Sequence, residues 1–136
     1  MIKGIHGFNI AVENLEEATA RYEAVFGVTA EPLGADDFAF PGLIGARLVV
    51  GGLAIQLIAS TEENTSVAKF LESRGEGLFL VSVEVDDMDG DVADLKEKGL
   101  NFVLPEPIRG AFGAVDFSHP KSMHGVQFEF LQPQKD

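Results

Sequence analysis

A single carboxylate, that of Glu129, stands inside the apolar run "VQFEFLQ" at residues 126–132. The run alternates in the manner of a β-strand, so Glu129 shares one strand face with Gln127 and Leu131. A carboxylate surrounded by apolar groups has a raised pKa and can take up and return a proton, which makes Glu129 a candidate general base. A strand that faces solvent would also carry such a residue, and that alternative stays open.

The composition is that of an ordinary globular protein. The chain has 136 residues, of which 46% are hydrophobic and 24% charged. A domain of this size folds without the help of a metal or a disulfide, and we expect residues 1–136 to form one domain. The absence of cysteine from the sequence excludes disulfides, thiolate metal ligands and thiol nucleophiles.

Charge and hydropathy narrow the classes of partner. The formal net charge of -12 argues against nucleic acid and anionic membrane surfaces, so an anionic ligand would need a local basic patch. The first residues, "MIKGIHGFNIAVENLEEA", do not resemble a secretory signal, and no apolar run is long enough to cross a bilayer. We therefore expect a cytoplasmic protein that binds neither nucleic acid nor membrane, with a small molecule as its ligand.

Hydrophobic periodicity and end signals predict the same order of elements twice. The first half is expected to hold a strand at 5–12, a helix at 15–26, and strands at 29–32, 46–50 and 53–59. The second half is expected to hold a strand at 78–85, a helix at 88–98, and strands at 102–104, 113–117 and 126–131. Asn14 and Gly27 bound the first helix, whereas Asp86 or Asp87 begins the second and Gly99 ends it.

The two halves also align with each other. An offset of 73 residues pairs "FNIAV" at 8–12 with "VSVEV" at 81–85, and "LAIQLIA" at 53–59 with "VQFEFLQ" at 126–132. An internal repeat is a stronger fold signal than local propensity. The sequence therefore predicts an α+β fold made of two tandem modules, at about 1–60 and 77–133, joined by a connector at 61–76 that includes a short helix.

Four of the predicted strands have one apolar face and one mixed face. This split predicts a curled mixed sheet with its helices outside and a partly polar concavity, the cup, inside. The polar residues expected in the cup are Asn9, Gln56, Ser82, Glu84, Gln127 and Glu129. Glu129 could act there as a base, anchor a ligand, or bond to its repeat partner Gln56 as scaffold polarity. Ser82 and Glu84 could assist it, whereas Asn9, Gln56 and Gln127 could orient a carbonyl or hydroxyl group.

Four segments carry a resemblance to a known family. They are "NIAVENLEEATARYEAVFGV", "SVAKFLESRGEGL", "VSVEVDDMDGDVADLKEKGL" and "FSHPKSMHGVQFEFLQP", which together span most of the chain. In these segments the chain resembles the vicinal oxygen chelate superfamily of glyoxalases, bleomycin resistance proteins and extradiol dioxygenases, and within it the methylmalonyl-CoA epimerases. The resemblance implies paired βαβββ modules, a U-shaped cup that holds a divalent metal, and a homodimer.

The metal-ligand positions implied by the resemblance fall on Gly7, Gln56, Leu80 and Glu129. The epimerases resemble one another in having histidine at the first and third of these positions, where this chain has glycine and leucine. A transition metal usually needs three or more protein ligands, some of them imidazole nitrogens. We therefore expect no catalytic metal and no cofactor.

Other residues near the implied site leave alternatives open. Strand parity points His6 to the helix side, although a β-bulge near Gly7 could turn it into the cup. The proton-transfer carboxylate of the epimerases aligns near Phe40, so Asp36 or Asp37 in the same loop would have to replace it unless both are solvated.

The "HPKS" turn is a further candidate for ligand binding. The resemblance places His119, Lys121 and Ser122 at the mouth of the cup, where they could meet phosphate or pantetheine groups. Arg47 and Arg109 could add positive charge to that ligand site. The alternative is a plain turn before the last strand, with its geometry fixed by Pro120.

Three functions from different classes follow. The first is a metal-independent isomerase or lyase that acts on a small carbonyl or acyl-CoA substrate, with Glu129 as the base. The second is a non-catalytic small-molecule-binding protein of the bleomycin-resistance type. The third is an interaction or structural subunit with a vestigial cup.

Overall fold

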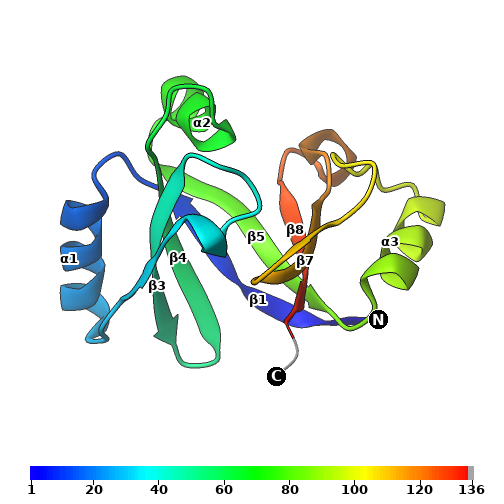
Figure 1. Cartoon of the computed structure of the whole chain (residues 1–136), viewed down its shortest axis with the longest axis horizontal. Coiled ribbons are helices and arrows are strands. Elements are labelled where there is room, and N and C mark those ends of the chain that lie inside the picture. The colour runs from blue at the N-terminus through cyan, green and yellow to red at the C-terminus, as the bar shows by residue number, and fades with distance from the viewer. Residues whose placement is uncertain (135–136) are drawn as a thin grey trace. The chain divides into compact units, whose positions relative to one another are not determined.

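The computed structural model describes residues 1–134 and builds them from eight strands, three α-helices and two 3-10 helices (Figure 1). In chain order the elements are β1 (Ile2–Ala11), α1 (Leu15–Phe26), β2 (Glu31–Leu33), η1 (Ala35–Asp37), β3 (Leu43–Val50), β4 (Leu53–Ser60), α2 (Ser66–Arg74), β5 (Gly77–Val85), α3 (Met88–Glu97), β6 (Ile108–Gly110), β7 (Gly113–Phe117), η2 (Pro120–Met123) and β8 (Phe128–Pro133). The strand order in the mixed sheet is β2-β3-β4-β1-β5-β8-β7-β6. The predicted α+β class is confirmed. No helix among the described residues is long and apolar enough to cross a membrane.

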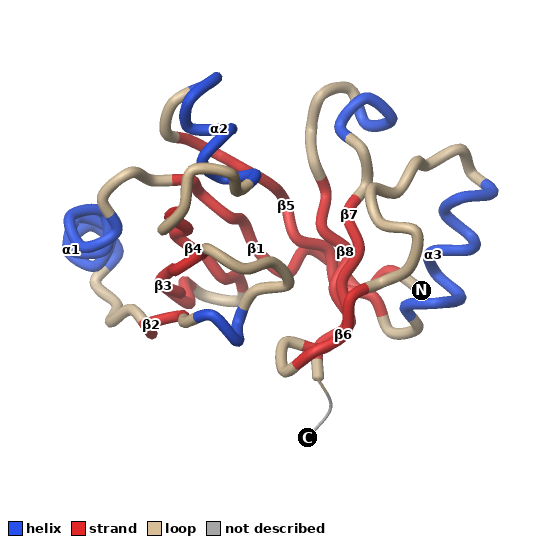
Figure 2. The backbone as a smooth tube through the Cα atoms, turned by 45° about the horizontal axis from the view of Figure 1, so that its top comes forward, coloured by secondary structure: helices blue, strands red, loops and turns tan. Residues whose placement is uncertain are grey.

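The chain forms two compact units. The first unit is Gly7–Phe79, and the second unit is Met1–His6 together with the chain from Leu80 onward. In the first unit β1 runs parallel to β4, and β4, β3 and β2 follow in antiparallel pairs. In the second unit β5 runs parallel to β8, and β8, β7 and β6 follow in antiparallel pairs. The two units therefore share one strand plan, and the first carries α1 and α2 whereas the second carries α3 (Figures 1 and 2).

The repeat seen in the sequence holds in the strand register. Phe8 pairs with Ile55 in the first unit and, 73 positions later in both strands, Val81 pairs with Phe128 in the second. The offset is the same for all the register pairs that the two parallel ladders have in common. Residues related by the repeat therefore occupy equivalent places in the two units.

Local signals set the ends of the helices where the sequence predicted them. The Asn14 side chain accepts a hydrogen bond from the backbone N–H of Glu17 at 3.0 Å, and Gly27 ends α1 in the left-handed conformation at φ 68°. Of the two aspartates considered for the start of α3, Asp87 is the one that caps it, by accepting from the N–H of Gly90. The helix predicted at 15–26 is confirmed at both ends.

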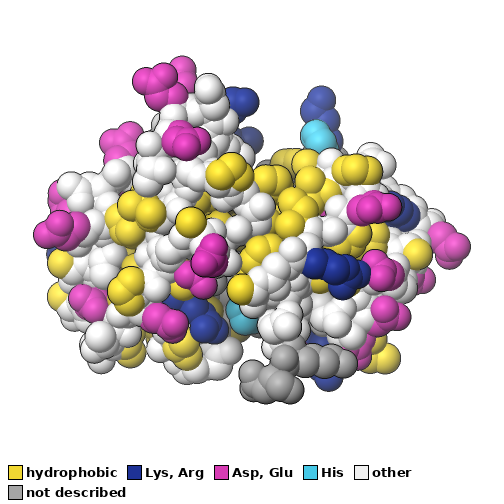
Figure 3. Space-filling view, viewed as in Figure 1, with side chains coloured by type: hydrophobic (Ala, Val, Ile, Leu, Met, Phe, Trp, Pro, Cys, Tyr) yellow, Lys and Arg dark blue, Asp and Glu magenta, His cyan; other side chains and the backbone are white. Residues whose placement is uncertain are grey.

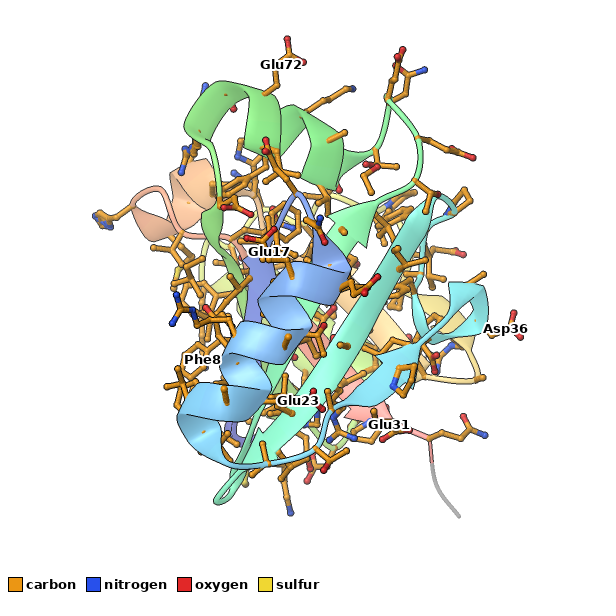
Figure 4. The ribbon with its side chains drawn as sticks, turned by 90° about the vertical axis from the view of Figure 1, so that its left-hand side faces the viewer. Phe8, Glu17, Glu23, Glu31, Asp36 and Glu72 are labelled. Carbon is orange, nitrogen blue, oxygen red and sulfur yellow. The ribbon has the colours of Figure 1, made fainter. Side chains whose placement is uncertain are left out.

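Each unit buries the apolar face of its own strands under its own helix. In the first unit α1 packs on β3 and β4 and crosses in front of these strands in Figure 4. The buried residues of that core are Val12, Leu48, Leu57 and Ala59. In the second unit α3 packs on β5 and β8, and the buried residues there are Val83, Val85, Met88, Val92, Ala114 and Phe130. The apolar faces predicted for these strands thus supply Leu57, Val83, Val85 and Phe130 to the two cores. Leu53 is exposed, and Phe79 packs on α2 instead.

The strand face opposite α1 is apolar at one end, because α2 covers it. Ala11 and Ile58 lie on that face and form a core with Val67 of α2. Phe70 of α2 meets Phe79 edge to face, with 5.2 Å between the ring centroids. The polar residues of the first unit are therefore confined to the other part of this face.

One predicted strand is wrong. Residues 102–104 are not a strand but run beside β7, with a single bridge from Phe102 to Ser118. The ladder breaks because the N–H of Leu104 donates to the Asp116 side chain at 3.3 Å instead of to a backbone carbonyl. Proline follows at 105 and again at 107, and proline has no N–H to donate. Pairing with β7 resumes only at β6.

The last strand also begins later than predicted, at Phe128 instead of 126. The residues before it are used by η2 and its closing turn, in which the N–H of Val126 donates to the carbonyl of Met123 at 3.3 Å. The remaining predicted elements have ends within three residues of those observed. Boundaries of this kind depend on turn geometry that periodicity does not report.

Candidate functional site

Ser82 and Glu129 form the polar pair of the second unit. They are register partners in β5 and β8, and the Ser82 hydroxyl donates a hydrogen bond to Oε1 of Glu129 at 2.7 Å. Ser82 is buried and Glu129 is half-buried. Burial raises the pKa of the Glu129 carboxyl because desolvation disfavours the charged form, and the Ser82 hydrogen bond opposes that shift. Such a carboxyl can exchange protons with a ligand closer to neutral pH than an exposed one.

Glu84 lies on the same strand face, two residues after Ser82, and is register partner of Leu131. Its Oε1 lies 3.8 Å from Nδ1 of His6, within the range of an ion pair. His6 therefore reaches toward the face opposite α3, whereas strand parity alone had pointed it to the helix side. Strand parity did not predict this contact, whereas the alternative in which His6 turns away from the helix side is in line with it.

The first unit carries a different polar group at the equivalent place. Asn9 and Gln56 are register partners in β1 and β4, and Arg47 in β3 is the register partner of Gln56 on its other side. The three side chains lie on the face opposite α1, since Leu48 and Leu57 next to them in sequence belong to the α1 core. Asn9 is only 6% exposed.

These three side chains have no partner within the part of the chain that the structure describes. No hydrogen bond or ion pair there involves the side-chain groups of Asn9, Gln56 or Arg47. Nε of Arg47 is buried and has no acceptor among residues 1–134. The first unit thus presents a row of donors that bond to no other described residue, where the second unit presents a carboxylate.

The two remaining positions of the implied metal site carry no donor atoms. At Gly7 the backbone approaches β4 so closely that a Cβ would lie 1.9 Å from the carbonyl oxygen of Ala54. No side chain fits there without a shift of the backbone. Leu80 is 2% exposed and apolar. Of the four implied positions, only Gln56 and Glu129 carry side-chain donors, whereas a transition metal usually needs three or more. Among the described residues no three His, Asp or Glu side chains lie grouped to hold a metal ion, and no step below passes through one.

The "HPKS" turn forms η2 and is closed by its own hydrogen bonds. Nδ1 of His119 accepts from the backbone N–H of Lys121 at 3.2 Å, and the Ser122 hydroxyl donates to the carbonyl of His119 at 2.8 Å. His119 and Lys121 are exposed, and Figure 3 shows a histidine next to a basic side chain at the upper edge of the view. These contacts account for the turn itself, and its role in ligand binding stays a prediction.

Gln127 lies just before β8, and its carbonyl accepts a hydrogen bond from the N–H of Val81 at 3.1 Å. Its side chain is half-buried, and its role in orienting a ligand stays a prediction. Arg109, considered as a source of positive charge, instead donates from its Nη2 to both carboxylate oxygens of Asp89, at 2.9 and 3.0 Å. Its charge is therefore largely matched within the second unit.

The loop acids of the first unit are solvated. Asp36 and Asp37 belong to η1 and are exposed, and Figure 4 shows the Asp36 side chain pointing away from the protein. Asp37 accepts a hydrogen bond from the N–H of Gly34 at 2.8 Å, which holds it in the loop. The alternative that treated them as solvated loop residues describes them better than the one that brought them to a ligand.

Asp116 is a buried acid that the sequence reasoning missed. It is 0% exposed, its Oδ1 accepts from the backbone N–H groups of Phe117 and Leu104, and its Oδ2 has no partner among the residues that the structure describes. Burial raises the pKa of its carboxyl, and the two backbone hydrogen bonds oppose that shift. Its register partner is Phe130, so it faces the α3 core. The signal that could have found it was the same as for Glu129: a lone acid inside the apolar run "GAVDF".

The chain was compared with known proteins. Residues 6–119 match the family profile described as Glyoxalase/Bleomycin resistance protein/Dioxygenase superfamily. Mitochondrial methylmalonyl-CoA epimerase of Bos taurus is 32% identical over 126 residues, covering 90% of this chain and 70% of the relative. The Homo sapiens epimerase is 31% identical over 125 residues, with the same coverage of 90% and 70%.

Solved structures agree with the sequence relatives. Methylmalonyl-CoA epimerase from Mycobacterium tuberculosis superposes with a TM-score of 0.88 at 31% identity, covering 98% of this chain and 90% of that one. A variant of the Streptomyces coelicolor epimerase in complex with 2-nitronate-propionyl-CoA gives 0.85 at 29% identity, covering 99% and 100%. An epimerase in complex with methylmalonyl-CoA and NH4+ gives 0.86 at 30% identity, covering 98% and 96%. The chain therefore belongs to the Glyoxalase/Bleomycin resistance protein/Dioxygenase superfamily.

Proposed function

We propose that this protein is an isomerase or lyase that acts on a small carbonyl or acyl-CoA-type substrate, with Glu129 as its acid-base residue. The observation that carries the proposal is the half-buried Glu129 carboxyl, whose pKa is raised by burial and whose Oε1 is fixed by Ser82. The relatives that were solved with methylmalonyl-CoA and with 2-nitronate-propionyl-CoA support an acyl-CoA as the substrate class.

The Ser82 hydroxyl gives the two oxygens of Glu129 different roles. Oε1 is occupied by the hydrogen bond, so Oε2 is the atom that takes the proton from the carbon next to the substrate carbonyl. The electrons of the broken C–H bond form a double bond to the carbonyl carbon, and the carbonyl oxygen takes the negative charge of the resulting enolate. Oε2 can return the proton only to the face from which it came, so an isomerase needs a solvent water to protonate the opposite face, while Glu129 releases its proton to solvent. Return of the enolate electrons with expulsion of a leaving group from the next carbon gives a lyase.

Exchange of the substrate α-proton with solvent tests the proposal. Proton NMR of methylmalonyl-CoA and related thioesters in D2O, with EDTA and again with added Co2+, follows that exchange. We expect exchange that persists in EDTA, because no protein step depends on a metal. We expect Glu129→Gln to lower the exchange rate by about 100-fold or more, since an amide cannot take the proton.

A matched control separates the loss of the base from a loss of charge. Glu72 is an exposed carboxylate on α2 whose side chain points to solvent in Figure 4, and Glu72→Gln should leave the exchange rate unchanged. Exchange that survives Glu129→Gln, or that occurs only with Co2+, contradicts the proposal.

A non-catalytic binding protein of the bleomycin-resistance type is the second candidate. It is favoured by the repeat, because the residue of the first unit equivalent to Glu129 is Gln56, an amide that does not transfer protons. The two units therefore supply one carboxylate at these positions and not two. In the same NMR samples, substrate line broadening without exchange in either tube would favour this candidate.

A further inference from the structure

Arg47 carries a positive charge that no acidic side chain of the first unit pairs with. It lies on β3, on the face opposite α1, and its buried Nε has no acceptor in the described part of the chain. Desolvating a guanidinium N–H without a partner costs free energy, so a buried donor of this kind needs an explanation. The explanation can be structural or can be a ligand.

A structural explanation would need an acid or carbonyl beside Arg47. The nearest acid by strand register is Glu31, the register partner of Arg47 in β2. Glu31 is exposed, and within the described residues it forms no ion pair with Arg47. No backbone carbonyl of the described residues accepts from the guanidinium either. The charge of Arg47 is thus unmatched within its own unit.

The neighbours of Arg47 add donors to the cation. Gln56 is its register partner in β4, and Asn9 is the next register partner in β1, so the three side chains form one row across three strands. Both amides are without hydrogen-bond partners among the residues described. A guanidinium offers a planar fork of N–H groups, and each amide offers two more. Such a row matches an oxyanion.

We propose that Arg47, Gln56 and Asn9 form a binding site for a carboxylate group of a small-molecule ligand. The guanidinium fork fits the two oxygens of a carboxylate in a bidentate pair, and the amides hold the same oxygens from the side of β4 and β1. Acidic side chains predominate on the face seen in Figure 3, and the formal net charge is -12, so an anion is held only where a cation is isolated from acids. The site stands on the first unit alone and goes beyond the proton chemistry proposed for Glu129.

Arginine side-chain NMR tests this assignment on the full chain. The Nε–Hε signals of the 15N-labelled protein are followed while malonate is added at constant ionic strength, and Arg47→Lys assigns the Arg47 signal by removing it. We expect the Arg47 signal to shift and saturate with malonate and to stay in place with malonamide, its neutral analogue.

Comparing the malonate Kd of Arg47 variants tests whether this residue sets the affinity. Arg47→Met keeps most of the apolar stem and removes the charge, and we expect the Kd for malonate to rise at least about tenfold. Arg21→Met is the matched control, because Arg21 is an exposed arginine on α1 of the same unit, and its Kd should equal that of the wild type. Arg47→Lys keeps the charge without the fork and should give a smaller, several-fold rise, which serves as the test if Arg47→Met does not fold.

Three results overturn the proposal. They are an unchanged malonate Kd in Arg47→Met, tighter binding of inorganic phosphate than of malonate at the Arg47 signal, and an Arg47 signal that moves in Glu31→Gln but not with malonate. The last would mean that Arg47 pairs with Glu31 in solution. Because malonate binding is read without turnover, it is independent of the D2O exchange that tests Glu129.

Discussion

The two units hold different chemistry in the same frame. Asn9 and Gln56 in the first unit, and Ser82 and Glu129 in the second, occupy the same register positions of a parallel strand pair. The first unit places amide donors there and the second a hydroxyl that donates to a carboxylate. The repeat therefore fixes where a side chain stands but not what it does, and the two halves have become a donor face and a proton-accepting face.

The adjacent antiparallel strand, β3 in the first unit and β7 in the second, adds to the chemical difference between the two units. Next to Gln56 the first unit has Arg47, whereas next to Glu129 the second unit has Phe117, which is 7% exposed. A cation beside a carboxylate would lower its pKa, and an aromatic ring does the reverse by excluding water. The raised pKa of Glu129 is thus caused by the residues that bury it, and the neighbouring Phe117 is one of the residues beside it in this row.

The largest expected effect on stability comes from adding a side chain at Gly7 of the first unit. Because a Cβ at this position would lie 1.9 Å from the carbonyl oxygen of Ala54, Gly7→Ala forces β1 and β4 apart. We expect the free energy of unfolding to fall by about 3 kcal/mol, measured by urea denaturation. The control is Gly52→Ala, where nothing lies within 4 Å of the added Cβ and the change should be small. Equal stabilities of the two variants would show that position 7 has room for a side chain, such as that of a metal ligand.

A second difference lies on the helix-facing side of the same strands. By register, the place that Ala46 fills beside Leu57 in the first unit is filled by Asp116 beside Phe130 in the second. Asp116→Ala removes the acceptor for the N–H groups of Leu104 and Phe117, and we expect the free energy of unfolding to fall by about 2 kcal/mol in urea denaturation. Hydrogen exchange at Leu104 should accelerate in the same variant.

The control for Asp116→Ala is Asp116→Asn, which keeps an acceptor oxygen and removes the titration. The folded pKa of Asp116 is raised, so the native state binds more protons than the unfolded state, and its contribution to stability is lost as pH rises through the folded pKa. The difference in unfolding free energy between wild type and Asp116→Asn should therefore shift in favour of the variant as pH increases. A difference that does not vary with pH contradicts the raised pKa.

How far the sequence could predict this molecule depends on the kind of signal. Alternation and the offset of 73 placed Glu129 and its neighbours on the right strand face, because side-chain parity is a local property of the chain. Residues 102–104 were mistaken for a strand because the hydrogen bond that breaks the ladder comes from Asp116, which is remote in sequence. The contact of His6 with Glu84 and the isolation of Arg47 depend likewise on which strands become neighbours, and only the folded chain settles that.

The smallest expected effect concerns the hydrogen bond from Ser82 to Glu129, which distinguishes this polar pair from Asn9 and Gln56. The Ser82 hydroxyl opposes the rise in the pKa of Glu129, so Ser82→Ala should raise that pKa further. The rising limb of the pH profile of α-proton exchange should then move to higher pH, while the rate on the plateau falls less than tenfold, because Glu129 itself is kept. Ser73→Ala is the control, since the exposed Ser73 hydroxyl bonds only to the backbone of α2. A limb that stays in place would mean that the solvation of Glu129, and not Ser82, sets the proton affinity of the second unit.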